Sequence, residues 1–255
     1  MGTEWTSLLA IAIYSKSLDQ GRPYDIVDLP LCQFSNKRQR NLTSRDALTM
    51  FFVLDGVDGA GKSTQLEMFV QWLGEQGHDV VTCSDPGSTE LGEQIRSILL
   101  GKHETPISMR AEMMLFTTAR TQLIQQIIKP ALARGQTIVL DRYIFSTVVY
   151  QGHAGNLDPD EIWTTNRIAT ENHLPDATFI LDVPVDIAMA RLGKTLDRME
   201  SRGNEYFERV RSGFLLESQR WPDTVDVIDA TRPPAEIQSD IRRLATQYID
   251  RRASK

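Results

Sequence analysis

Short apolar runs alternate with longer amphipathic segments from Met50 onward. Runs of this length that are apolar throughout are typical of strands buried on both faces of a parallel sheet. Five strands are predicted, at Phe51–Asp55, Val80–Ser84, Thr137–Asp141, Thr178–Asp182 and Thr224–Ile228. Strands that alternate with helices indicate helical layers on both faces of the sheet. The pattern therefore predicts one doubly wound α/β domain, a three-layer sandwich around a five-stranded parallel sheet.

The segments between these strands carry apolar residues at the spacing of amphipathic helices. The stripe of the first helix, which ends near Gly77, consists of Leu66, Phe69, Val70 and Leu73. The stripe of the second helix, Glu90–Leu100, consists of Leu91, Ile95, Ile98 and Leu99. Ser108–Ala133 is predicted as one long helix that Pro130 kinks. Further helices are predicted at Pro159–Asn172, Val185–Arg191, Tyr206–Arg220 and Pro234–Arg252.

Residues 1–49 show no sustained helix or strand period. They combine a short apolar patch, scattered Gly, Pro and Asn, and the basic cluster Lys37–Arg40. We expect a disordered N-terminal extension, or a segment upstream of a true start at Met50, with a docking arm as the alternative. The folded domain is accordingly predicted over residues 50–255.

Composition and charge narrow the classes of partner. A chain of 255 residues with 41% hydrophobic residues can bury one good core. Its net charge of -6 gives no support for a nucleic-acid partner. No apolar run approaches the roughly 20 residues that span a bilayer. We therefore expect no membrane partner. Because Cys32 and Cys83 have neither metal-ligand spacing nor the density of a disulfide framework, we expect a cytoplasmic location.

The clearest chemical motif is the segment Gly56–Ser63, GVDGAGKS, between the first strand and the first helix. Its spacing is that of a P-loop, whose backbone N–H groups cradle phosphates at a helix N-terminus. Lys62 would reach the β- and γ-phosphates of ATP, and Ser63 would bind Mg²⁺. The residues expected to bind ATP here are Gly56, Val57, Asp58, Gly59, Ala60, Gly61, Lys62, Ser63 and Thr64.

A second phosphate-handling element ends the third predicted strand. Asp141 follows an apolar run and is followed by Arg142. A carboxylate there commonly caps a strand, but beside a P-loop it is the usual second anchor for Mg²⁺. The chain has no Asn-Lys-x-Asp motif of a guanine-nucleotide switch, so a small-molecule kinase is favoured. A regulatory protein that has lost catalysis would be expected to have lost Lys62, Asp141 or Arg142, and all three are present.

From about Met50 to Ile249 the sequence resembles the thymidylate kinase family. The resemblance rests on Leu54–Gln65, Asp85–Thr89, Gly92–Arg96, Leu115–Arg120, Ile128–Leu132, Asp141–Gly152 and Leu196–Glu200. It implies the P-loop NTPase fold with a short lid at about residues 191–204. It also implies Mg²⁺-dependent phosphorylation of dTMP to dTDP by ATP, by in-line transfer in dTTP synthesis, and a homodimer.

The resemblance also implies an acceptor site. The matching positions are Asp58, Asp85, Arg96, Phe116, Arg120, Arg142, Ser146, Thr147, Tyr150 and Gln151. Phe116 would stack on thymine, and Arg120, four residues later on the same helical face, would donate to a thymine carbonyl. Thr147 and Gln151 would hydrogen-bond the pyrimidine edge, and Tyr150 would crowd the sugar 2′ position.

The catalytic residues implied by the family are Lys62, Arg142, Asp58 and Arg198. Asp58 would reach the sugar 3′-hydroxyl, and Arg142 would grip the dTMP phosphate. Because Gly59 stands where some members have an arginine, the charge on the transferred group would be neutralised by a basic lid. The lid cations would be Arg191, Lys194 and Arg198, of which Arg191 and Lys194 would contact ATP. The metal-binding set would be Ser63, Asp141 and Asp85.

One segment departs from the family pattern. Bacterial members commonly have Arg-Glu-Pro-Gly-Gly where this chain has Ser84–Ser88. The arginine is missing, and Asp85 has a shorter reach than glutamate. A preference for dUMP or a 5-substituted pyrimidine monophosphate is therefore the alternative to dTMP.

Overall fold

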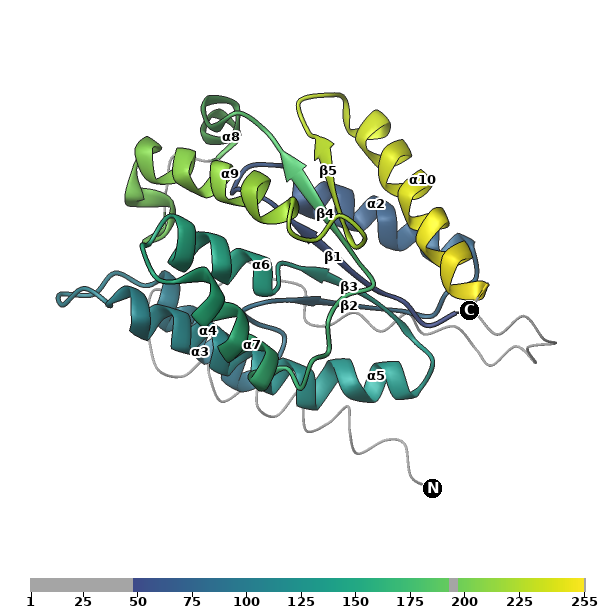
Figure 1. Cartoon of the computed structure of the whole chain (residues 1–255), viewed down its shortest axis with the longest axis horizontal. Coiled ribbons are helices and arrows are strands. Elements are labelled where there is room, and N and C mark those ends of the chain that lie inside the picture. Colours follow the sequence, from purple (N-terminus) through teal and green to yellow (C-terminus); the bar gives the residue numbers. More distant parts are fainter. Residues whose placement is uncertain (1–47, 193–196, 255) are drawn as a thin grey trace, which may run out of the picture. The chain divides into compact units, whose positions relative to one another are not determined.

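Five parallel strands form the centre of the molecule in the computed structural model, which describes residues 48–192 and 197–254. The strands are β1 (Phe51–Asp55), β2 (Val80–Ser84), β3 (Thr137–Asp141), β4 (Ala177–Asp182) and β5 (Val225–Asp229). They pair in the order β2-β3-β1-β4-β5 (Figure 1). Each lies within one residue of its predicted bounds, and the predicted fold class is confirmed.

Helices cover the sheet on both faces. They are α2 (Lys62–Glu75), α3 (Glu90–Leu100), α4 (Met109–Leu123), α5 (Lys129–Ala133), α6 (Ile144–Thr147), α7 (Pro159–Ala169), α8 (Val185–Arg191), α9 (Asn204–Ser218) and α10 (Pro234–Ala253). A short 3-10 turn, η4 (Glu200–Arg202), precedes α9. Within the described ranges, no helix combines the length and apolarity needed to cross a bilayer.

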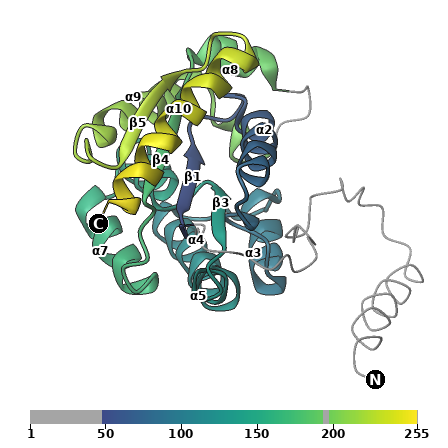
Figure 2. The same ribbon diagram turned by 90° about the vertical axis from the view of Figure 1, so that its right-hand side faces the viewer.

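Successive side chains of β1 point to opposite faces of the sheet, as in any β-strand. The Phe52 ring lies 5.3 Å from that of Phe69 on α2, and α10 packs beside α2 (Figure 2). The next residue, Val53, instead lines an apolar cavity together with Trp163 on α7. The centre of the sheet is thus buried on both faces, which explains why β1 is apolar from Phe51 to Leu54.

The long helix predicted over residues 108–133 has the expected extent but not a uniform hydrogen-bond pattern. Between α4 and α5 lies the π-helical turn η2 (Ile124–Ile128). Pro130 cannot donate a hydrogen bond to the preceding turn, and the wider turn ends two residues before it. A second π-helical turn, η3 (Val148–His153), follows α6 and carries several of the predicted acceptor residues.

One helix boundary differs from its prediction for a clear reason. The helix predicted to end at Asn172 ends at Ala169. Glu171 and Asn172 have φ values of 50° and 56°. Residues in this left-handed region cannot continue a right-handed helix.

The sheet topology brings two segments of the predicted site together. Asp141 is paired with Leu54 across β3 and β1, and the N–H of Arg142 donates to the Leu54 carbonyl at 3.0 Å. Because parallel strands end at the same edge, the P-loop and the Asp141–Arg142 pair lie side by side. The predicted adjacency of the second carboxylate and the P-loop strand is confirmed.

Candidate active site

The P-loop wraps around the ammonium group of Lys62. Lys62 Nζ donates to the carbonyl oxygens of Val57 at 2.9 Å and Gly56 at 3.2 Å. Burial lowers the pKa of Lys62, and the positive charge of Arg142 adds to this shift, whereas the nearby carboxylates of Asp58, Asp141 and Asp55 oppose it. A Cβ at Gly56, where φ is +136°, would lie 2.5 Å from the Leu181 carbonyl oxygen. Glycine therefore allows the loop to approach β4 closely.

A buried carboxylate that the sequence analysis assigned no role anchors the loop. Asp55, the last residue of β1, is fully buried. It accepts hydrogen bonds from Gly56 N at 2.9 Å, Ser146 Oγ at 2.7 Å and Arg142 Nη1 at 3.3 Å. Burial raises the pKa of Asp55 even though Arg142 opposes this. Its signal in the sequence is the same as that of Asp141, a carboxylate at the end of an apolar strand.

Arg142 and Asp58 form an ion pair at the rim of the loop. Arg142 Nη2 donates to Asp58 Oδ1, and Tyr150 Oη donates to Asp58 Oδ2 at 2.8 Å. Burial opposes the charge of Asp58, but Arg142 and Lys62 outweigh it and lower the pKa of Asp58. Burial likewise opposes the charge of Arg142, but Asp58 holds the pKa of Arg142 well above its usual value. The pair is therefore ionised across the whole neutral range.

A cavity of about 170 Å³ opens beside this ion pair. It is lined by all ten residues expected at the acceptor site: Asp58, Asp85, Arg96, Phe116, Arg120, Arg142, Ser146, Thr147, Tyr150 and Gln151. These residues come from the P-loop, the segment after β2, α3, α4, and the segment from β3 to η3. We refer to this space as the acceptor cavity.

Arg120 lies at the base of the acceptor cavity, with only 1% of its surface exposed. Its Nε donates to Asp85 and its Nη1 to Asn166. Its Nη2 donates at 3.0 Å to both Tyr143 O and Thr147 Oγ1. Since a guanidinium carries five N–H groups, these four bonds leave one for a ligand. Asn166, on α7, gave no signal in the sequence.

Asp85 retains a polar atom without a partner. Its Oδ1 is buried and has no hydrogen-bond partner among the described residues. Burial raises the pKa of Asp85, although Arg120 opposes the shift. Nearby, Arg96 Nη1 donates to the Pro86 carbonyl at 2.9 Å, so Arg96 is oriented by the segment that follows Asp85.

A second buried carboxylate that the sequence did not predict as part of the site, Glu112, contacts Gln151. Gln151 Nε2 donates to Glu112 Oε1 at 2.7 Å. Glu112 Oε2 accepts from Arg198 Nη2 and Arg202 Nη2, both at 2.6 Å. Gln151 Oε1 is buried without a partner among the described residues. In the sequence, Glu112 has the features of an ordinary acidic residue in the first turn of a helix.

The predicted lid cations do not meet at the P-loop in this conformation. Both terminal nitrogens of Arg191 donate to the Ala230 carbonyl at 3.2 Å. Arg198 is held by Glu112 and by the Leu99 carbonyl, to which its Nε donates at 2.6 Å. Lys194 lies outside the described residues.

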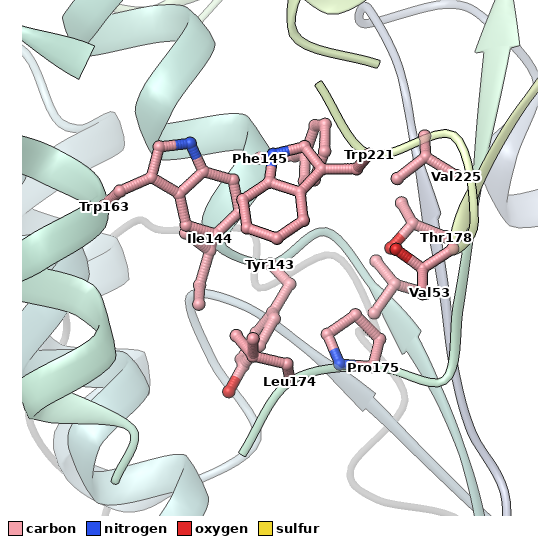
Figure 3. A pocket seen from close by; sticks show the side chains of 11 residues that line it. Val53, Tyr143, Ile144, Phe145, Trp163, Leu174, Pro175, Thr178, Trp221 and Val225 are labelled. Carbon is pink, nitrogen blue, oxygen red and sulfur yellow. The ribbon is translucent and has the colours of Figure 1, made fainter. Parts of the chain in front are cut away.

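A second cavity, of about 120 Å³, shares no lining residue with the acceptor cavity. Figure 3 shows the indoles of Trp163 and Trp221 beside Phe145 on one side and Val53 with Thr178 on the other. Its lining is almost wholly apolar and carries no charged side chain. It is therefore unsuited to a phosphorylated ligand.

Comparisons with known proteins agree on one family. The thymidylate kinase family model matches residues 54–241. A thymidylate kinase of Symbiobacterium thermophilum is 39% identical over 206 residues, which cover 80% of this chain and 96% of that protein. One of Thermosipho africanus is 39% identical over 201 residues, 78% of this chain and 99% of that protein. One of Rhodopirellula baltica is 40% identical over 188 residues, 74% of this chain and 76% of that protein.

Two glycines of the P-loop allow a matched test of its packing. Gly59 and Gly61 have φ values of +80° and +93°, but only at Gly59 would a Cβ clash, at 2.2 Å from the Ala188 carbonyl oxygen of α8. Both Gly→Ala variants incur the left-handed backbone cost of about 1–2 kcal/mol. We expect Gly59→Ala to lower the free energy of unfolding by about 1–3 kcal/mol more than Gly61→Ala. Urea unfolding without nucleotide measures the difference, and equal destabilisation would contradict the α8 contact.

Proposed function

The chain belongs to the thymidylate kinase family, and we propose that its P-loop binds ATP while the acceptor cavity binds dTMP. As a member of this family it is a nucleoside monophosphate kinase that phosphorylates dTMP to dTDP with ATP. The observation that carries the site assignment is the acceptor cavity, which is lined by ten matching residues and reaches the P-loop at Asp58. The two substrates would therefore meet at the edge where β1 and β3 end.

On the donor side, the backbone of residues 56–64 and the side chain of Lys62 would hold the ATP phosphates. Within the described part of the chain, Lys62 donates only to neutral carbonyls, and burial lowers its pKa. Phosphate oxygens would supply the negative charge that these carbonyls lack, so the lysine gains by exchanging partners. The N-terminus of α2 adds its dipole at the same place.

On the acceptor side, Arg142 and Arg96 would bind the dTMP phosphate. The guanidinium group of Arg142 is already held along the P-loop by hydrogen bonds that its Nη1 donates to Asp55, Gly56 O and Ser146 Oγ. A phosphate that replaces Asp58 at this group would free the Asp58 carboxylate for the sugar 3′-hydroxyl. Tyr150, whose hydroxyl is bonded to Asp58, would then lie against the deoxyribose.

The thymine ring would occupy the part of the cavity farthest from the P-loop. Phe116 would stack on the ring, and Arg120 would donate its remaining N–H to a carbonyl oxygen. Thr147 and Gln151 would face the pyrimidine edge. Gln151 Oε1, buried without a partner in residues 48–192 and 197–254, suits the N3–H donor of thymine, because a buried acceptor without a partner is costly.

A Mg²⁺ ion fits the residues at the phosphate edge. Asp141 Oδ1 is buried and has no partner among the described residues, and Ser63 lies in the first turn of α2. Carboxylate and hydroxyl oxygens are ligands that suit this hard cation. Asp85 also has an oxygen without a partner among the described residues. Its ion pair with Arg120 holds its other oxygen, so Asp85 would contribute less to the metal site than Asp141. When bound, the ion would neutralise negative charge on the phosphates.

Transfer itself would depend on alignment and charge neutralisation, since in-line phosphoryl transfer requires no covalent intermediate. Lys62 would contact the transferred phosphoryl group from the ATP side and Arg142 from the dTMP side, and Asp58 would orient the acceptor. Arg191, Lys194 and Arg198 are proposed to close over ATP. In the described conformation Arg191 and Arg198 have other partners, so closure requires both to leave them.

We also propose that the protein is a cytoplasmic homodimer with no nucleic-acid partner. Its net charge of -6 is unfavourable for binding polynucleotides. Leu91 and Ile98 on α3, Met114 on α4 and Ile168 on α7 are large apolar side chains that are 40% to 76% exposed. Because α4 packs against both α3 and α7, these side chains lie on neighbouring helices. A second copy would cover them.

Lys62→Ala is expected to lower kcat/KM for ATP and dTMP by about 10²–10³-fold, because it removes the buried cation nearest the phosphates. A coupled assay of ADP release measures this. Lys102→Ala, at an exposed position outside the site, serves as the control. Near-wild-type turnover by a folded Lys62→Ala protein would contradict the assigned role.

Asp141→Asn is expected to raise the Mg²⁺ concentration for half-maximal activity by about tenfold or more. The amide keeps the size of the side chain but removes its charge. Activity is measured in a Mg²⁺ titration after chelation. Asp250→Asn, on the exposed face of α10, should leave the midpoint unchanged. An unchanged midpoint in Asp141→Asn would remove this residue from the metal site.

Ile98→Lys is expected to convert the dimer into a monomer, because it places a charge in the proposed apolar interface. Light scattering coupled to size-exclusion chromatography measures the mass, which should fall by half. Val227→Lys introduces the same charge at an exposed position of β5 and should leave the mass unchanged. A wild-type protein that is already monomeric would overturn the proposal.

A further inference from the structure

The amide of Gln151 has two ends in different surroundings. Its nitrogen donates to Glu112 at 2.7 Å, and its oxygen is buried without a partner among the described residues. Gln151 is 1% exposed and lines the acceptor cavity. The direction of this amide therefore decides whether the cavity offers the ligand an acceptor or a donor.

The groups around Glu112 determine that direction. Glu112 is fully buried, and its Oε2 accepts from both Arg198 and Arg202. A carboxylate that pairs with guanidinium groups can only accept hydrogen bonds. A turned Gln151 amide would place its oxygen against Glu112 Oε1, where two buried acceptors would face each other.

Further hydrogen bonds connect Arg202 to the backbone of η3. Arg202 Nη1 donates to Tyr206 Oη at 2.6 Å, and Tyr206 Oη donates to the Tyr150 carbonyl at 2.6 Å. Since Tyr150 precedes Gln151 in η3, the cluster around Glu112 is tied to the backbone that carries the amide. Glu112 itself lines no part of the acceptor cavity.

We propose that Glu112 is a positioning residue that fixes the Gln151 amide so that the acceptor cavity selects a pyrimidine with an N3–H donor. The inference rests on the proposed binding of the base beside Gln151. Thymine and uracil have hydrogen on N3, whereas N3 of cytosine is an acceptor. Cytosine would leave two buried acceptors facing each other, and such mismatches are strongly rejected. Glu112 thereby contributes to the exclusion of dCMP without touching the nucleotide.

Glu112→Gln tests the proposal. The two arginines require an acceptor, so the oxygen of the new amide would face them and its nitrogen would face Gln151. Gln151 would then turn and present its own nitrogen to the cavity. We expect the ratio of kcat/KM for dTMP to that for dCMP to fall by about tenfold or more. The ratio for dTMP to dUMP should stay unchanged, because both bases carry N3–H.

Two further variants distinguish an effect of the orientation of the Gln151 amide from an effect of the net charge around Glu112. Arg202→Gln keeps the Glu112 carboxylate with Arg198 and Gln151, and should retain the wild-type preference for dTMP over dCMP. Glu112→Gln combined with Arg202→Gln restores the net charge of the wild-type cluster, while Arg198 still requires an acceptor when the nucleotide first binds, before the proposed lid closure. This double variant should lose the preference as Glu112→Gln does, and it also serves if the single variant fails to fold.

The outcomes distinguish the inference from the function on which it rests. Circular dichroism and thermal unfolding first establish that each variant is folded. If the wild-type enzyme does not prefer dTMP to dCMP, the proposed base site itself fails. If the wild-type enzyme prefers dTMP and a folded protein with Glu112→Gln keeps that preference, only the role of Glu112 is overturned. A parallel fall in the dTMP to dUMP ratio would also overturn it, because general damage to the pocket would then explain the loss.

Discussion

Mutual neutralisation of buried charges at the end of β1 and β3 is the constraint on which the site depends. Asp58 and Arg142 carry opposite charges and form an ion pair, whereas burial shifts the pKa values of the neighbouring Asp55 and Lys62 toward their neutral forms. Each is costly to bury alone. The pKa of Asp58 is lowered and that of Arg142 is raised because each stabilises the charge of the other. The P-loop, the end of β3 and the start of α6 are therefore held in one arrangement by the same set of charges.

This arrangement would also allow the proposed site to receive two highly charged substrates. In the described conformation Lys62 is bonded to loop carbonyls and Arg142 to Asp58. Phosphate oxygens would give Lys62 charge-assisted hydrogen bonds in place of neutral carbonyls, and they would replace one charged partner of Arg142 with another. The cations are already directed toward the loop, and little reorganisation is then needed at the moment of transfer. In the free protein Asp58 stabilises the charge of Arg142, and the same carboxylate would orient the acceptor in the proposed complex.

The sequence predicted the parts of this arrangement that depend on local pattern and on strand order. All five strands and most helix bounds followed from periodicity, and the adjacency of Asp141 and the P-loop followed from parallel topology. The π-helical turns were not predicted, because hydrophobic spacing does not reveal which carbonyl accepts each hydrogen bond. Glu112 was missed for another reason. Its partners Arg198 and Arg202 lie about 90 positions away in the chain, and each of these side chains resembles an ordinary solvated charge in its own segment.

The π-helical turn η3 connects the two parts of the site. It begins directly after Thr147 and contains both Tyr150 and Gln151, which line the acceptor cavity together with Thr147. Tyr150 faces the charge cluster through Asp58, whereas Gln151 faces Glu112. Adjacent residues of one short turn thus contact two separate carboxylates, and each carboxylate is held by arginine. Because π-helical turns are uncommon and occur frequently at functional sites, the irregular segment is the element that would direct sugar and base recognition in the proposed site from one stretch of backbone.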